Sequence, residues 1–120
     1  MTRRRVAIPV AAAASLALAL PAQAVRPSQV RGEVGPYRTI QLKDVSGGTV
    51  QNLKAGTFKF TIRDRSSEHN FALRGPGVNR ALTGVPQTGT VTKTVQLRKG
   101  SYTFYCVPHA RAMRGTFKVV

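Results

Sequence analysis

Residues 90–106 read TVTKTVQLRKGSYTFYC and contain two alternating segments with a turn between them. In residues 90–97, β-branched side chains recur at every second position, and in residues 101–106 Tyr102 and Phe104 fall on one face. Because side chains of a strand point alternately to its two faces, this period of two predicts strands. Lys99-Gly100 has the composition of a turn. The stretch therefore predicts two consecutive strands.

The same pattern recurs on both sides of this stretch. In residues 57–63, Phe58, Phe60 and Ile62 share one face, and Gly/Pro-rich turns separate the segments. Nothing after residue 24 shows a sustained helical period. We interpret residues 25–36 as a leader or an irregular first strand, and residues 78–89 as turns. Short strands at regular spacing predict an all-β antiparallel sandwich or barrel. The other predicted strands cover residues 37–45, 69–73 and 115–120.

Length and composition limit what such a chain can do. The chain has 120 residues, with 19 Lys and Arg against 4 Asp and Glu, a net charge of +15. This length predicts a single domain and excludes a multidomain enzyme. One Cys excludes an internal disulfide, and two His cannot build a site with several metal ions.

The first 24 residues have the pattern of a cleaved export signal. Three arginines at positions 3–5 precede an apolar run over residues 6–20. The segment ends with Ala22-Gln23-Ala24, whose two alanines stand at the positions that a signal peptidase recognises. The alternative is an uncleaved membrane anchor, although the run is short for a spanning helix. The arginines fit a general basic start or a twin-arginine signal.

Cleavage would leave a domain of residues 25–120 in the periplasm or outside the cell, without stable membrane insertion. It would keep 16 Lys and Arg and all four acids, a net charge of +12. A domain of this size without a disulfide gains from another source of stability, and a bound metal is one candidate.

Potential metal ligands gather around the loop between the last two predicted strands, residues 101–106 and 115–120. Cys106, His109 and Met113 lie within eight residues, and the other histidine, His69, lies far upstream. Thiolate, imidazole and thioether suit copper, and His₂Cys with a weak axial Met defines a blue copper site. Each residue also has an ordinary explanation: a buried thiol, a surface histidine or a core methionine.

Three motifs resemble the small cupredoxins of the plastocyanin, pseudoazurin and amicyanin type. Residues 105–109 (YCVPH) and 113–119 (MRGTFKV) resemble the copper loop and last strand of that family, and residues 68–71 (EHNF) resemble its upstream ligand segment. The resemblance implies a Greek-key antiparallel β-sandwich. It also implies one mononuclear type 1 copper ion bound by His69, Cys106 and His109, with Met113 as the axial ligand.

The resemblance gives Asn70 a supporting role. The residue after the first histidine ties the two ligand loops together and donates a hydrogen bond toward the cysteine sulfur. Val107 stands where the family usually carries Ser or Thr, so a backbone group is expected to bind the Asn70 side chain. The spacing of four between His109 and Met113 lies between those of amicyanin and plastocyanin.

These features favour a mobile one-electron carrier, expected as a monomer, over an enzyme, because two histidines leave no ligands for a catalytic copper cluster. An exported copper-binding or delivery protein is the alternative, and a metal-free basic binding module is a third. The positive charge fits steering toward an acidic redox partner, or equally solubility and adhesion to anionic cell surfaces. Nucleic acid is not an expected partner of an exported chain.

Overall fold

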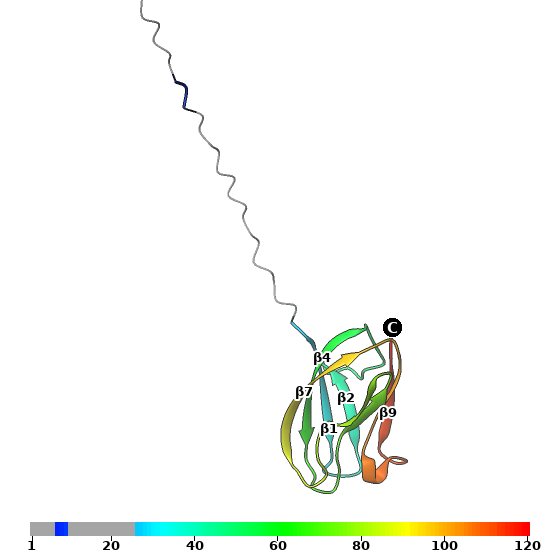
Figure 1. Ribbon diagram of the computed structural model, residues 1–120. Coiled ribbons are helices and arrows are strands. Elements are labelled where there is room, and N and C mark those ends of the chain that lie inside the picture. Colours follow the sequence, from blue (N-terminus) through cyan, green and yellow to red (C-terminus); the bar gives the residue numbers. More distant parts are fainter. Residues whose placement is uncertain (1–6, 10–25) are drawn as a thin grey trace, which may run out of the picture.

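The computed structural model describes residues 7–9 and 26–120, and the second range folds as a two-layer β-sandwich (Figure 1). One sheet has the strand order β2-β1-β4-β7 and the other β3-β9-β8-β5-β6. The prediction of an all-β sandwich is thus confirmed. The strands are β1 (Ser28–Val34), β2 (Ile40–Asp44), β3 (Asn52–Leu53), β4 (Gly56–Asp64), β5 (Ala72–Gly75), β6 (Val78–Ala81), β7 (Gly89–Leu97), β8 (Gly100–Tyr105) and β9 (Arg114–Val119).

The hydrophobic alternation of the strands builds the core between the two sheets. In β4, Phe58, Phe60 and Ile62 are buried, while the residues between them face outward. In the opposite sheet, the stacked rings of Tyr102 and Phe117 lie 5.2 Å apart between centroids. Burial of such a side chain contributes about 1.5–3 kcal/mol, so the sandwich rests mainly on these apolar faces.

The pairing of the strands differs from the purely antiparallel prediction in two places. β1 runs parallel to β4, and β3 runs parallel to β9, whereas the other five pairs are antiparallel. β1 is also a regular strand between β2 and β4, not a leader. The sequence of β1 lacks a clear hydrophobic alternation because Gly32 occupies an inward position. There Ile62 and Phe71 leave no room for a side chain.

Two shorter segments also depart from the sequence-based prediction. Val78–Ala81, predicted as turn, forms the edge strand β6, with three of its four residues exposed. Such a strand carries little hydrophobic pattern because hardly any of it is buried. His69 lies in the loop before β5 rather than in a strand, since β5 begins at Ala72.

Several strand ends meet at one end of the sandwich. The parallel strands β1 and β4 end there at Val34 and Asp64, which are paired. At the same end, Tyr105 at the end of β8 pairs with Arg114 at the start of β9. Between β8 and β9 lies the short 3-10 helix η1 (Val107–His109), at the end opposite the C terminus in Figure 1. The predicted metal ligands come from the loops at this end.

The predicted export signal, residues 1–24, lies outside the described residues apart from residues 7–9. Within the described ranges, no helix is long and apolar enough to cross a membrane.

Candidate metal centre

Cys106 is positioned by the end of β8 and by a loop that closes on itself. Its backbone N–H donates to the Met113 carbonyl at 3.0 Å, so the two ends of the loop are joined. Its carbonyl accepts from His109 N–H at 3.1 Å, which forms η1, and Pro108 fits the first turn of that helix. The thiol is fully buried, whereas His109 is partly exposed.

His69 reaches the same point from the other ligand loop, which joins β4 to β5. Ala72 of β5 pairs with Tyr105 of β8, and this register places the residues before β5 beside the residue after β8. His69 is 4% exposed, so its imidazole lies inside the fold. The sheet register thus unites ligands that are 37 residues apart in the sequence.

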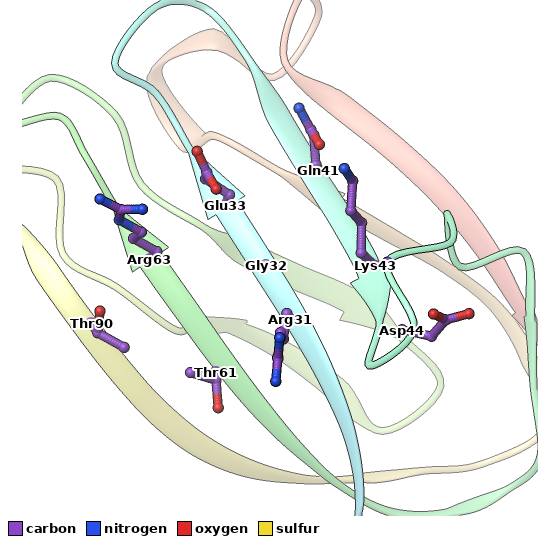
Figure 2. Close-up of a pocket in the computed structure, with 10 residues that line it drawn as sticks. Arg31, Gly32, Glu33, Gln41, Lys43, Asp44, Thr61, Arg63 and Thr90 are labelled. Atoms are coloured by element: carbon purple, nitrogen blue, oxygen red, sulfur yellow. The ribbon is translucent and has the colours of Figure 1, made fainter.

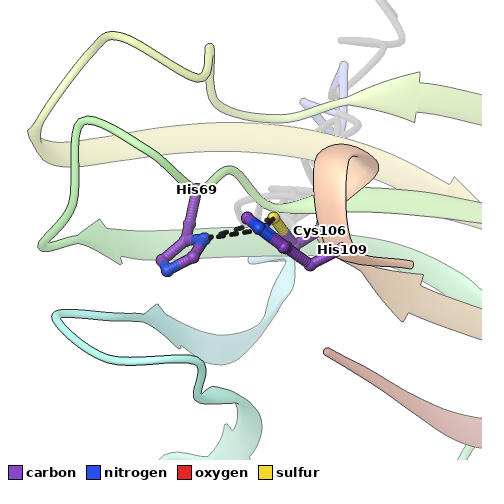
Figure 3. Close-up of side chains that lie close together, drawn as sticks. All are labelled: His69, Cys106 and His109. Carbon is purple, nitrogen blue, oxygen red and sulfur yellow. Dashed lines mark hydrogen bonds between the residues drawn. The ribbon is translucent and has the colours of Figure 1, made fainter. Parts of the chain in front are cut away.

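The three side chains point at one another, as Figure 3 shows. Cys106 Sγ lies 3.7 Å from Nδ1 of His69 and 3.7 Å from Nδ1 of His109, and the two Nδ1 atoms are 3.1 Å apart. Two imidazole nitrogens and a sulfur thus face a common point. A cation at that point would bind all three atoms.

The two sulfur–nitrogen separations fit a single metal ion bound by three ligands, and the 3.1 Å between the two Nδ1 atoms corresponds to a narrower nitrogen–metal–nitrogen angle of about 100°. Bonds of about 2.0–2.1 Å to nitrogen and about 2.3 Å to sulfur, at angles near 120°, place the nitrogen and sulfur atoms roughly 3.7–3.8 Å apart. The observed 3.7 Å agrees with this value. One thiolate with two imidazoles is a donor set suited to copper, and it is the trigonal set of a type 1 site.

Asn70 joins the two ligand loops through backbone groups. Its N–H donates to Cys106 Sγ at 3.5 Å, and its side-chain oxygen accepts from Val107 N–H at 2.8 Å. The expectation that a backbone group replaces the missing Ser or Thr side chain is therefore confirmed. Because hydrogen bonds to a ligating sulfur tune its electron density, Asn70 acts on the centre as well as on the loops.

Thr83 completes this support, although no sequence pattern indicated a role for it. Its carbonyl accepts from the Asn70 side-chain amide at 3.3 Å, and its hydroxyl accepts from Phe71 N–H at 2.8 Å. Thr83 lies in the stretch predicted only as turns, where a single hydroxyl has no distinguishing pattern. Its 4% exposure shows that this loop packs against the site.

Asp64 is a buried carboxyl behind the ligand loop. Burial raises its pKa above the ordinary value, while the hydrogen bond from the Ser66 backbone N–H opposes that rise. Oδ1 accepts from Ser66 N–H at 3.1 Å, but Oδ2 is the one buried side-chain polar atom in the described chain without a hydrogen-bond partner. Asp64 is not one of the clustered potential ligands. It instead fixes the turn that leads to His69.

Met113 is buried beside Cys106 in a small apolar cluster. The cluster consists of Val34, Cys106 and Met113, with Ile40 packed against it, and Met113 is 1% exposed. Its N–H donates to the His109 carbonyl at 2.8 Å, which fixes the backbone between these two residues. Met113 thus shares a cluster with the Cys106 side chain, and the surroundings of the centre are apolar on this side.

Comparisons with known proteins agree with this picture. The family model described as copper binding proteins, plastocyanin/azurin family, matches residues 49–120. A search of curated proteins found no match.

Solved structures share the fold at low sequence identity. Rusticyanin from Thiobacillus ferrooxidans is 18% identical, with a TM-score of 0.51 over 77% of this chain and 76% of that one. Auracyanin A, a blue copper protein from the green thermophilic photosynthetic bacterium Chloroflexus aurantiacus, is 17% identical, with a TM-score of 0.54 over 79% of this chain and 100% of that one. A chain of a heme-copper terminal oxidase dimer is 15% identical, with a TM-score of 0.55 over 77% of this chain and 63% of that one.

Proposed function

Because the chain belongs to the plastocyanin/azurin family of copper binding proteins, we propose that it is a type 1 copper protein that carries single electrons between partners. The observation that carries this proposal is the convergence of His69 Nδ1, Cys106 Sγ and His109 Nδ1 at 3.1–3.7 Å inside a braced pair of loops. We propose that it acts as a carrier and not as an enzyme. A visible spectrum of the copper-loaded protein tests the proposal directly.

The residues around the centre suit fast electron transfer. Copper, when bound, supplies a Cu(II)/Cu(I) couple. The backbone hydrogen bond between Cys106 and Met113 and the hydrogen bonds of Asn70 to Cys106 and Val107 hold the ligand atoms in place. The site therefore needs little rearrangement between the two oxidation states. His109 is the ligand with partial exposure, next to the 53% exposed Val107, and its edge offers the route to a partner.

Burial of the ligands supports electron transfer over copper delivery. Cys106 and Met113 are 0% and 1% exposed, and His69 is 4% exposed. Handing an ion to another protein requires incoming ligands to reach it, whereas an electron crosses through His109 without ligand exchange. A closed site therefore favours a carrier that retains its metal.

We also propose that the protein works outside the cytoplasm, in the periplasm or at the cell surface. The supporting observation is the basic start, apolar run and Ala22-Gln23-Ala24 ending of residues 1–24.

We propose Met113 as the axial ligand, and its replacement should shift the reduction potential. Met113→Gln supplies a harder oxygen donor that favours Cu(II), so the potential should fall. Met113→Leu keeps the volume but removes the donor, so the potential should rise. Each shift is expected to be about 60 mV or more, a tenfold change for a one-electron couple. Voltammetry measures both. Unchanged potentials in the two variants would make Met113 a packing residue only.

We propose an acidic redox partner, because the domain from Arg26 onward carries many more bases than acids. Attraction between opposite charges raises the encounter rate, and salt screens it. Oxidation of the reduced protein by anionic hexacyanoferrate(III) should therefore slow as ionic strength rises. A cationic cobalt(III) complex of similar size is the control and should react faster with salt. Equal salt dependence for the two oxidants would contradict electrostatic steering.

A further inference from the structure

The outer face of the sheet β2-β1-β4-β7 carries no apolar side chain at its outward positions. The alternating burial of these strands and their register identify that face. A sheet with one face in the core usually exposes polar residues on the other face, with positive and negative charges mixed. This one is strongly cationic, with Arg31, Lys43, Lys59 and Arg63. The other outward residues are Gln29, Glu33, Gln41, Thr57, Thr61, Thr90, Thr92, Thr94 and Gln96.

Three of these cations surround a shallow hollow. Arg31, Lys43 and Arg63 line an open pocket of about 420 Å³ (Figure 2). Its other polar and charged lining residues are Gln41, Thr61, Thr90 and the acidic Glu33 and Asp44. The pocket thus places guanidinium and ammonium groups beside hydroxyl groups on an open surface. These are groups that bind phosphate oxygens.

The acidic residues at this face do not neutralise these cations. Glu33 pairs with Arg65 at 3.2 Å, and this is the only salt bridge within residues 26–120. Asp44 Oδ1 accepts from Ser46 and Gly48, which keeps its carboxylate in its own turn. Arg31, Lys43 and Arg63 therefore present charges without a carboxylate partner.

The register makes this arrangement costly for the isolated domain. Arg31 of β1 pairs directly with Lys43 of β2. Like charges opposite each other on neighbouring strands destabilise a sheet. An anion held between them would relieve that repulsion.

From these observations we infer that the outer face of this sheet binds the anionic surface of a phospholipid bilayer through its headgroup phosphates. Protein interfaces need buried apolar or aromatic anchors, and this face has none. A flat array of cations instead matches a surface of repeated phosphates. Each Lys or Arg held near such a surface contributes a factor of about 5 to the affinity.

This binding mode leaves the metal centre free. The cationic face is the outer surface of the sheet β2-β1-β4-β7. His109 instead lies in η1, beyond the strand ends at one end of the sandwich. A molecule lying with this sheet on a bilayer would point His109 along the membrane plane. Redox partners bound to the same membrane could then reach it by lateral diffusion.

Vesicle sedimentation tests the inference with two charge-matched variants of the full chain. In the face variant, Arg31, Lys43 and Arg63 become Gln, and in the control variant the exposed Arg80, Lys99 and Lys118 outside this face become Gln. Both variants lose three charges and keep residues 1–25, so any binding through that segment is common to all proteins. Neutral phosphatidylcholine vesicles measure that shared binding, and vesicles with added phosphatidylglycerol measure the electrostatic part.

At about 0.1 M salt, charges more than roughly 10 Å from the bilayer are screened. The wild-type chain should prefer the anionic vesicles. The face variant should lose about 100-fold in affinity for them, and the control variant about 3-fold or less. Both should keep the wild-type copper spectrum, which shows that the fold is intact. Equal losses in the two variants, or a wild-type chain without preference for anionic vesicles, would overturn the inference.

Discussion

Replacement of Cys106 by Ser is expected to abolish the intense visible absorption of the oxidised, copper-loaded protein. The absorption arises from the thiolate bonded to Cu(II), and a hydroxyl cannot provide it. Loss of a supporting residue around a metal typically costs 10–100-fold in affinity, so loss of this central ligand should cost more than about 100-fold. Titration with Cu(II), followed by absorption and by dialysis, measures both effects.

Val107→Ala is the matched control for this experiment. Val107 adjoins Cys106 and is 53% exposed, and the substitution preserves the backbone N–H that binds Asn70. The control should retain both colour and affinity. If Cys106→Ser keeps the wild-type spectrum while remaining folded, the sulfur is not a copper ligand.

Copper is expected to stabilise the fold strongly. His69 and Cys106 come from loops on different strands, and the ion joins them only in the native state, so part of its binding free energy becomes folding free energy. At a copper concentration about 1,000 times the dissociation constant, the gain is about 4 kcal/mol. For a domain of this size, that corresponds to a rise in melting temperature of more than roughly 10 °C.

Thermal melts of the metal-free and copper-loaded protein measure this gain. The Cys106→Ser variant serves as the control, because it should show little shift when the same copper is added. Equal melting temperatures for wild type with and without saturating copper would show that the ligand loops are not linked through the metal.

The sequence predicted those parts of the fold in which one face of a strand is buried. Phe58, Phe60 and Ile62 alternate with polar residues, and β4 appears at the predicted place. The convergence of Cys106, His109 and the distant His69 was also expected, because few residue types bind soft metals and this chain has few of them. Such predictions succeed where chemistry or burial restricts the choice of residue.

Other features depend on tertiary contacts that leave no local pattern. The regular strand β1 was obscured by the inward-facing Gly32, and its parallel pairing with β4 depends on the path of the whole chain. Thr83 supports Asn70 through a backbone carbonyl, which any residue possesses. The burial of Asp64 follows from the packing of the loops around it rather than from its neighbours in sequence.

The visible absorption spectrum of the wild-type protein, recorded during titration with Cu(II), tests the central claim most directly. We predict an intense thiolate-to-copper band that grows until one equivalent of copper has been added and then stops. This result follows from a single centre formed by His69, Cys106 and His109. A copper-loaded protein that remains colourless, or a band that saturates only after several equivalents, would contradict a single type 1 centre and the electron-transfer function based on it.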